Sequence, residues 1–309
     1  DLGHIAAYED LWLNHRVAGR ALLRQDLATL YDAFETPRKV RGDLEFLRGA
    51  ELREYMAAVR ERALEAPVDD GDLHELVIRH ELQHTETMLQ VMALAGLLPP
   101  GFDGPQPVPG SGLEMVEVPE GPFEFGAPAE GFAYDNERPR HTASTARFTI
   151  GRTPVTNAAW SAFAERGGYT RREWWSDAGW TWRSENEVAG HPGGPPDAPV
   201  VHVSCFEAEA FARSHDARLP TEPEWEKAAT AGLLGGTGEV WEWTASRFAG
   251  YPGFVAYPYR EYSEVFFGDR YRVLRGGSCA THPRVASPHF RNWDLPQRRQ
   301  LFAGVRIAR

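Results

Sequence analysis

Apolar residues near the start of the chain recur at the spacing of one helix face. Two segments show this most clearly, residues 1–13 and residues 51–65, and each pattern predicts an amphipathic helix. The expected inward positions of the first segment are Ile5, Tyr8, Leu11 and Trp12. Those of the second segment are Leu52, Tyr55, Met56, Val59 and Leu64.

The longest helical pattern covers residues 72–98. It follows a break at residues 69–72 and ends at Gly96 with Pro99 and Pro100, which stop a helix. Residues 27–34 predict a short helix or a turn. Three or four helices joined by short connections are typical of a bundle, which we expect over residues 1–98.

Residues 99–112 hold five prolines and separate two regions of different periodicity. Neither a helix nor a central strand tolerates that density of proline. We therefore predict that residues 99–112 are a linker between two domains.

From residue 113 onward, short alternating runs replace the helical spacing. Strands are predicted at residues 115–118, 123–125 and 148–150, and helices at residues 157–165 and 205–215. Ser204 is a good N-cap for the second of these helices, and Thr221 with Glu224 forms a capping box for a third. The fold class expected for the chain is α+β, with short strands and long loops in residues 113–309.

Composition limits the partners of the protein. The net charge is −11, which disfavours sequence-independent binding to nucleic acid or to an anionic membrane. The two cysteines form no disulfide framework, and no apolar run is long enough to span a bilayer. We expect a cytoplasmic, monomeric protein that acts on small molecules.

His80 and His84 are four residues apart within the longest predicted helix, so both imidazoles lie on one face and can reach one metal ion. The same string is an H-E-x-x-H motif, in which Glu81 would be the general base of a zinc peptidase. It is also compatible with a surface helix that carries two unrelated histidines. The string alone does not provide a third ligand.

Six ordered motifs in the second half are specific in combination: GRTPVTN at residues 151–157, RLPTE at 218–222, EWEKAA at 224–229, GEVWEWT at 238–244, RGGS at 275–278 and GVRIAR at 304–309. Together they resemble the formylglycine-generating-enzyme, or sulfatase-modifying-factor, fold, which is related to C-type lectins. The first half resembles a DinB-type bundle. The combination resembles the ergothioneine-biosynthesis sulfoxide synthases, non-haem iron enzymes that join a sulfur donor to hercynine with O₂.

This resemblance implies a set of site residues in the first half of the chain. The string HIAAYEDLWL at residues 4–13 matches the segment that supplies the third iron ligand, so the iron(II) ligands would be His4, His80 and His84. Gln83 would contact hercynine. Arg38 and Arg41 would hold the carboxylates of a γ-glutamylcysteine donor, for which the planar guanidinium fork is suited.

The resemblance also assigns roles near the C-terminus. Tyr259 would be the catalytic tyrosine, which supplies a proton or hydrogen atom, although the register across loops also allows Tyr257 or Tyr251. Tyr262 would lie near the ammonium group of hercynine. Three further residues would bind substrate: Trp293 by stacking on a trimethylammonium group, and Asp294 and Arg298 through the ammonium and carboxylate of the donor. Core packing is the alternative for Trp293.

The chain departs from the family pattern in several places. Connections are short at residues 229–238 and 191–198, and we expect that segments are absent from the sequence there and before Asp1 rather than that loops are deleted. Cys205 and Cys279 stand where aromatic residues are usual. We expect both to be buried small apolar residues, and their spacing gives no copper site.

The main hypothesis is an iron(II)- and O₂-dependent synthase that forms a C–S bond between hercynine and γ-glutamylcysteine or cysteine, giving a sulfoxide. A selenoneine synthase, which would take a selenosugar and form a C–Se bond, is a close variant with the same iron and hercynine motifs. A lectin-like binding module without catalysis predicts no O₂ uptake. A zinc peptidase predicts loss of peptide hydrolysis in Glu81→Gln.

Overall fold

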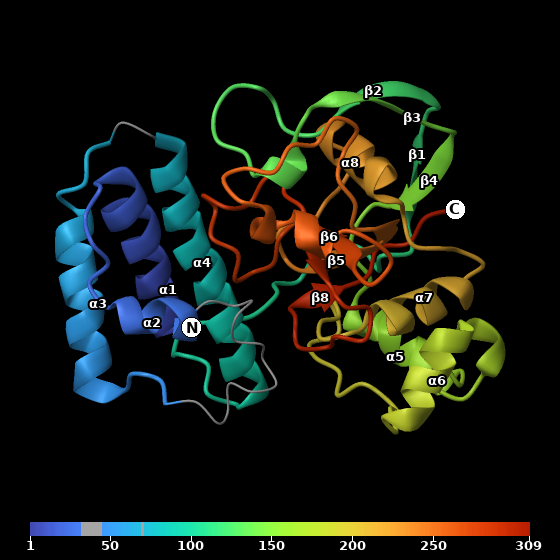
Figure 1. Cartoon of the computed structure of the whole chain (residues 1–309). Coiled ribbons are helices and arrows are strands. Elements are labelled where there is room, and N and C mark those ends of the chain that lie inside the picture. Colours follow the sequence, from blue (N-terminus) through green and yellow to red (C-terminus); the bar gives the residue numbers. More distant parts are fainter. Residues whose placement is uncertain (32–44, 69–70) are drawn as a thin grey trace. The chain divides into compact units, whose positions relative to one another are not determined.

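The computed structural model describes residues 1–31, 45–68 and 71–309 and has a mixed α+β fold (Figure 1). The chain divides into two compact units, Asp1–Met88 and Leu89–Arg309. The first is helical, and the second combines short strands, short helices and long loops. Each unit is described by itself below.

The first unit contains helices where the apolar periodicity predicts them. Their bounds are α1 (Leu2–Glu9), the π-helical segment η1 (Asp10–Val17), α2 (Gln25–Tyr31), α3 (Gly49–Ala63) and α4 (Gly71–Leu94). Ala6, Leu27, Tyr31, Leu47, Tyr55 and Val59 form the buried core of this unit. The helices predicted over residues 51–65 and 72–98 are thus confirmed, each with slightly different ends.

One predicted core position is wrong. Leu64 is 79% exposed, because α3 ends at Ala63 and the chain then turns away from the helical path. Ala63 and Ala66 are buried there instead.

The π-helix η1 also changes which residues face inward. A π-helix advances by a smaller angle per residue than an α-helix, so a 3.6-residue pattern does not track its buried face. Leu11 is only half-buried, whereas Asn14 is fully buried and donates hydrogen bonds to Asp10 Oδ1 (2.9 Å) and to the Val59 carbonyl (3.2 Å).

The second unit is built on small sheets. Strand β1 (Met115–Val118) pairs antiparallel with β4 (Phe148–Gly151), and β2 (Gly121–Phe125) pairs antiparallel with β3 (His141–Thr145). A four-stranded sheet has the order β7–β6–β5–β8, with β5–β8 parallel. Its strands are β5 (Trp241–Arg247), β6 (Arg272–Arg275), β7 (Asn292–Asp294) and β8 (Ala303–Gly304).

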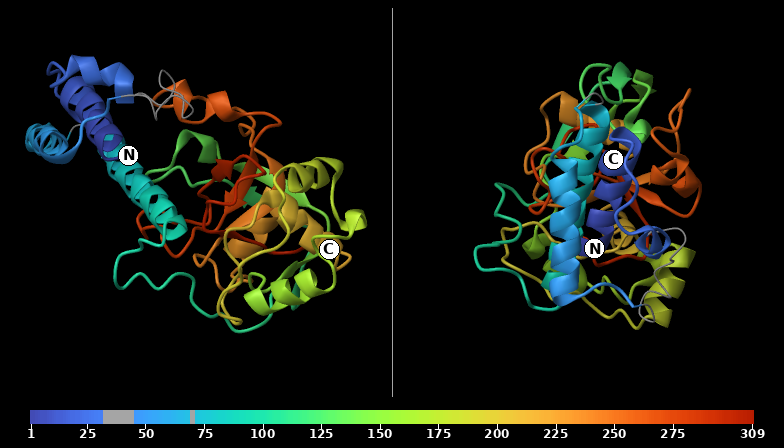
Figure 2. Two further views of the ribbon diagram at one scale, coloured as in Figure 1. Left: turned by 90° about the horizontal axis from the view of Figure 1, so that it is seen from below. Right: turned by 60° about the vertical axis from the view of Figure 1, so that its left-hand side comes forward.

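Short helices surround these strands. They are α5 (Asn157–Glu165), α6 (Asp177–Glu185), α7 (Cys205–Arg213) and α8 (Glu222–Thr230). The 3₁₀ turns are η3 (Asp135–Glu137), η4 (Arg172–Trp174), η5 (Arg260–Tyr262) and η6 (Glu264–Phe266). Within this unit, α8 lies with the β2–β3 hairpin and α5–α7 lie at the opposite end, as Figures 1 and 2 show.

Local capping explains where these helices begin. The side chain of Ser204 accepts a hydrogen bond from the Glu207 amide, and that of Thr221 accepts one from the Glu224 amide. Both are capping boxes, so the two predicted N-termini are confirmed. Helix α6, which begins after the cap Ser176, is not among the predicted elements.

Residues 99–112 contain neither a helix nor a strand, in keeping with their prolines. None of the helices in the described part of the chain combines the length and the apolarity needed to cross a membrane.

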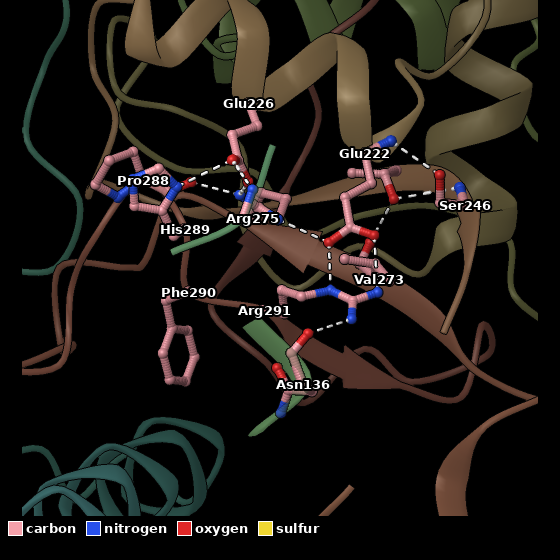
Figure 3. A network of polar contacts seen from close by, with 12 residues as sticks. Asn136, Glu222, Glu226, Ser246, Val273, Arg275, Pro288, His289, Phe290 and Arg291 are labelled. Carbon is pink, nitrogen blue, oxygen red and sulfur yellow. Dashed lines mark hydrogen bonds and ion pairs between the residues drawn. The ribbon is translucent and has the colours of Figure 1, made fainter. Parts of the chain in front are cut away.

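The family motifs form buried ion pairs in the second unit. Glu222 accepts hydrogen bonds from Arg275 (Nη1, 2.7 Å) and Arg291 (Nε, 2.6 Å), and Glu226 pairs with Arg275 and with His289 (Nδ1, 2.9 Å) (Figure 3). Arg275 and Arg291 are almost completely buried. The motifs thus contribute charged residues that neutralise one another inside the core, which is the condition for burying charge.

A second buried pair joins two other motifs. The guanidinium of Arg306 binds both carboxylate oxygens of Glu242, each at 2.6 Å, and donates to the Gly151 carbonyl at 2.8 Å. Both side chains are fully buried. The pair connects the C-terminal segment to β5 and to the end of β4.

Candidate active site

Three histidines converge in the first unit. His4 lies on α1, and His80 and His84 lie one turn apart on α4. The nitrogens available for a metal all lie within 4.8 Å of one another, and His4 Nε2 is 3.1 Å from His80 Nε2. Packing of α1 against α4 therefore supplies the third ligand that the H-E-x-x-H string lacks.

The geometry fits a metal ion. Two nitrogens bound at about 2.1 Å to one ion are 3.1 Å apart when the angle between them is about 95°. His4 Nδ1 donates to the Tyr31 carbonyl at 2.7 Å, which leaves the lone pair on Nε2 and fixes the orientation of the ring. Three neutral imidazoles suit iron, zinc, copper or nickel, and they leave coordination positions open.

The surroundings of His80 favour a neutral ligand. Burial, together with the neighbouring rings of His84 and His4, lowers the pKa of His80 well below the ordinary value for histidine. Tyr8 stacks on His80 with ring centroids 3.7 Å apart and planes 15° apart. His84 Nδ1 is 3.1 Å from Asp1 Oδ1, a carboxylate contact typical of metal-binding histidines.

Glu81 is engaged away from the histidine nitrogens. Its Oε2 accepts a hydrogen bond from Arg60 Nη2 (2.7 Å), and Arg60 Nε donates to the buried Glu9 (2.6 Å). A general base must be free to accept a proton from a metal-bound water, so this ion pair argues against the peptidase interpretation.

The other substrate residues expected in the first half differ in what can be described. Gln83 is half-buried on α4, one position from His84. Arg38 and Arg41 lie outside the described residues, so their role in binding the donor remains a prediction.

In the second unit, the predicted tyrosines and Trp293 lie close together. Tyr259 and Tyr262 have ring centroids 6.3 Å apart, and Tyr262 meets Trp293 edge-on at 6.1 Å. On its other side Tyr262 stacks on Tyr134, with centroids 4.9 Å apart and planes 5° apart. No family motif drew attention to Tyr134 in the sequence, and only the fold brings it to the predicted site residues.

Trp293 has both a packing role and an accessible part. One face stacks on Phe248 at 4.1 Å with planes 8° apart, which is core packing, yet the residue is half-exposed. The next residue, Asp294, is paired with Arg298 (Oδ2 to Nε, 3.8 Å). The structure thus groups the three C-terminal substrate residues of the prediction at β7 and the turn that follows it.

The alternative register of the catalytic tyrosine is less suited to chemistry. Tyr251 is 6% exposed and lies under the guanidinium of Arg291, 4.2 Å from ring centroid to Cζ. Burial raises the pKa of Tyr251 well above its ordinary value, which makes proton donation harder. Tyr257 is on the same segment as Tyr259 and is 48% exposed.

The cysteines are both free thiols in the described part of the chain. Cys205 is fully buried, as expected, and burial raises the pKa of its thiol well above the usual value. Cys279 is only half-buried, so the expectation holds in part.

Comparison with known proteins places this geometry in context. Residues 102–237 and 231–309 match the family model of the Sulfatase-modifying factor enzyme 1-like domain. The formylglycine-generating enzyme of Streptomyces coelicolor is 35% identical over 43% of this chain and 52% of its own length.

Two relatives align with the whole chain. The hercynine oxygenase of Mycolicibacterium thermoresistibile is 42% identical over 100% of this chain and 86% of its own length. That of Mycolicibacterium smegmatis is 41% identical over 100% of this chain and 90% of its own length. Both alignments span 384 positions against 309 residues here, so these relatives carry 384 − 309 = 75 or more positions that have no counterpart in this sequence. By this full-length similarity, the chain belongs to the hercynine oxygenase family and is an oxygenase-type oxidoreductase.

Proposed function

We propose that the protein is an iron(II)- and O₂-dependent synthase that joins the imidazole carbon of hercynine to the sulfur of a thiol such as γ-glutamylcysteine or cysteine, giving a sulfoxide in ergothioneine biosynthesis. One observation carries the proposal: the convergence of His4, His80 and His84 in a chain that aligns over its full length with hercynine oxygenases.

The three imidazoles would hold iron(II), which when bound supplies the redox chemistry with O₂. His4 and His80 are prepared for this role by the Tyr31 contact and by burial, respectively. Holding both substrates and O₂ in one complex would turn a three-body encounter into a reaction within a single assembly.

The remaining residues would bind the substrates and move a proton. Gln83 and Tyr262 would contact hercynine, and Trp293 would present its accessible part to the trimethylammonium group. Asp294 and Arg298, together with Arg38 and Arg41, would bind the charged groups of the donor. Tyr259 would supply the proton or hydrogen atom that commits the sulfur to bond formation.

A panel of donors tests the proposal. The protein is loaded with iron(II) without oxygen, mixed with hercynine, and divided among γ-glutamylcysteine, cysteine and a selenosugar before air is admitted. Mass spectrometry should show a coupled sulfoxide with one thiol. A coupled product only with the selenosugar would instead identify a selenoneine synthase, and no O₂ uptake with any donor, with iron shown to be bound, would reject the proposal.

Replacing Tyr259 with phenylalanine is expected to divert the reaction. Loss of the phenolic proton should lower the ratio of coupled product to merely oxidised thiol by about 10²- to 10⁴-fold, the usual contribution of a positioned acid or base. The ratio is measured by mass spectrometry, with Tyr257→Phe as the matched control. A larger effect at Tyr257 would move the catalytic assignment to that residue.

The domain organisation and cellular setting are part of the same proposal. Residues 1–98 would be the DinB-like iron-binding bundle, residues 99–112 the linker and residues 113–309 the sulfatase-modifying-factor-like domain. A cytoplasmic monomer is consistent with a thiol substrate, because a reducing compartment keeps thiols reduced.

A further inference from the structure

Two adjacent residues, Tyr134 and Asp135, hold the segment that carries the predicted catalytic tyrosine. Asp135 Oδ1 accepts a hydrogen bond from Ser263 Oγ at 2.7 Å, and its Oδ2 accepts one from the Tyr257 amide at 3.2 Å. These contacts lie at the two ends of the stretch that contains Tyr259 and Tyr262. The stack of Tyr134 on Tyr262 adds a contact between them.

The contacts are buried and therefore consequential. Asp135 is 6% exposed, Tyr134 is 2% exposed and Ser263 is fully buried. Hydrogen bonds to a charged carboxylate are stronger than neutral ones, and a buried carboxylate that loses its donors costs more than the bonds themselves. Burial raises the pKa of Asp135, and its hydrogen bonds from Ser263 and Tyr257 counteract that effect.

The base of this contact is rigid. Asp135 begins the 3₁₀ turn η3, and the next residue, Asn136, accepts a hydrogen bond through its carbonyl from Arg291 Nη1 at 2.6 Å (Figure 3). Arg291 is itself fixed by Glu222 in the buried ion-pair network. A continuous series of buried contacts therefore leads from the core of the second unit to the tyrosine segment.

We infer that Tyr134 and Asp135 are positioning residues that hold Tyr259 and Tyr262 in the geometry needed for proton supply and hercynine binding. The inference rests on the proposed function for its catalytic consequence. The holding of the segment itself does not depend on that function. Displacement of a catalytic group by about 1 Å can cost about a hundredfold in rate, so the effect on chemistry should be large even without contact to substrate.

Hydrogen exchange tests the holding directly. In Asp135→Asn an amide NH₂ or a single oxygen replaces the two acceptors, so one donor is lost. Exchange of the Tyr257 amide, followed by mass spectrometry on peptides covering residues 254–266, should accelerate by roughly tenfold to a hundredfold. Asp269→Asn, which alters an exposed carboxylate of the same unit, is the matched control and should leave these peptides unchanged.

Product partition tests the catalytic consequence. Asp135→Asn and Tyr134→Ala should each lower the ratio of coupled product to oxidised thiol at least tenfold at saturating substrates, and Tyr134→Phe, which keeps the stacked ring, should restore it. If Asp135→Asn fails to fold, Ser263→Ala, which removes a single contact, replaces it in both measurements.

The outcomes separate the two claims. Unchanged exchange in the variants would overturn the inference whatever the protein catalyses. Faster exchange with an unchanged product ratio, in a protein that does couple its substrates, would overturn the positioning role. Absence of coupled product in the unmodified protein would reject the proposed function, while the exchange result would still decide whether Asp135 holds the segment.

Discussion

Replacing His84 with alanine is expected to lower iron(II) affinity more than about 100-fold and to abolish product formation. Removing contacts that only orient a metal-bound histidine already costs about 10- to 100-fold in affinity, and His84→Ala removes a ligand outright. Anaerobic titration with iron(II) measures the affinity, and mass spectrometry measures the product. The thermal unfolding midpoint of the metal-free variant should stay close to that of the parent, because His84 is only half-buried.

Glu81→Gln is the matched control on the same helix. Glu81 is 42% exposed on its side chain and bound to Arg60, and exposed ion pairs contribute at most about 1 kcal/mol. We therefore expect this variant to bind iron and form product nearly as the parent does. The reverse result, with hydrolysis of peptides abolished by Glu81→Gln and zinc as the bound metal, would contradict the oxygenase site and support a peptidase.

Replacing Arg306 with methionine is expected to lower the free energy of unfolding by about 3–5 kcal/mol. The change leaves the fully buried Glu242 without its cation, with Trp225 Nε1 as a remaining donor at 2.5 Å. A buried unpaired carboxylate is far more costly than the loss of the attraction alone. Urea unfolding of the intact chain, followed by tryptophan fluorescence, measures the effect.

Two further variants identify the cause. Arg247→Met removes an exposed ion pair with Asp269 and should change stability by no more than about 1 kcal/mol. The double variant Arg306→Met with Glu242→Gln should recover part of the loss, because it removes the stranded charge. Equal losses in Arg306→Met and Arg247→Met would show that burial of the pair does not set its energetic role.

The local elements of this protein were determined by its sequence. The spacing of His80 and His84 requires only a helix to bring both imidazoles to one face, and α4 forms there. Ser204 and Thr221 begin their helices through side-chain bonds to amides three residues away. These features depend on neighbours along the chain, so periodicity and capping rules suffice to predict them.

Other features depended on residues that meet only after folding. His4 reaches His80 across 76 positions through packing of α1 on α4, and from the residues alone the third ligand could be named only by family resemblance. The family motifs gave no sign that Glu242 and Arg306 neutralise each other in the core, since such pairing is a matter of burial and not of spacing. Tyr134 and Asp135 carry no motif, and their contacts with residues 257–263 arise because the tertiary fold encloses both segments, where each buried polar group must find a partner.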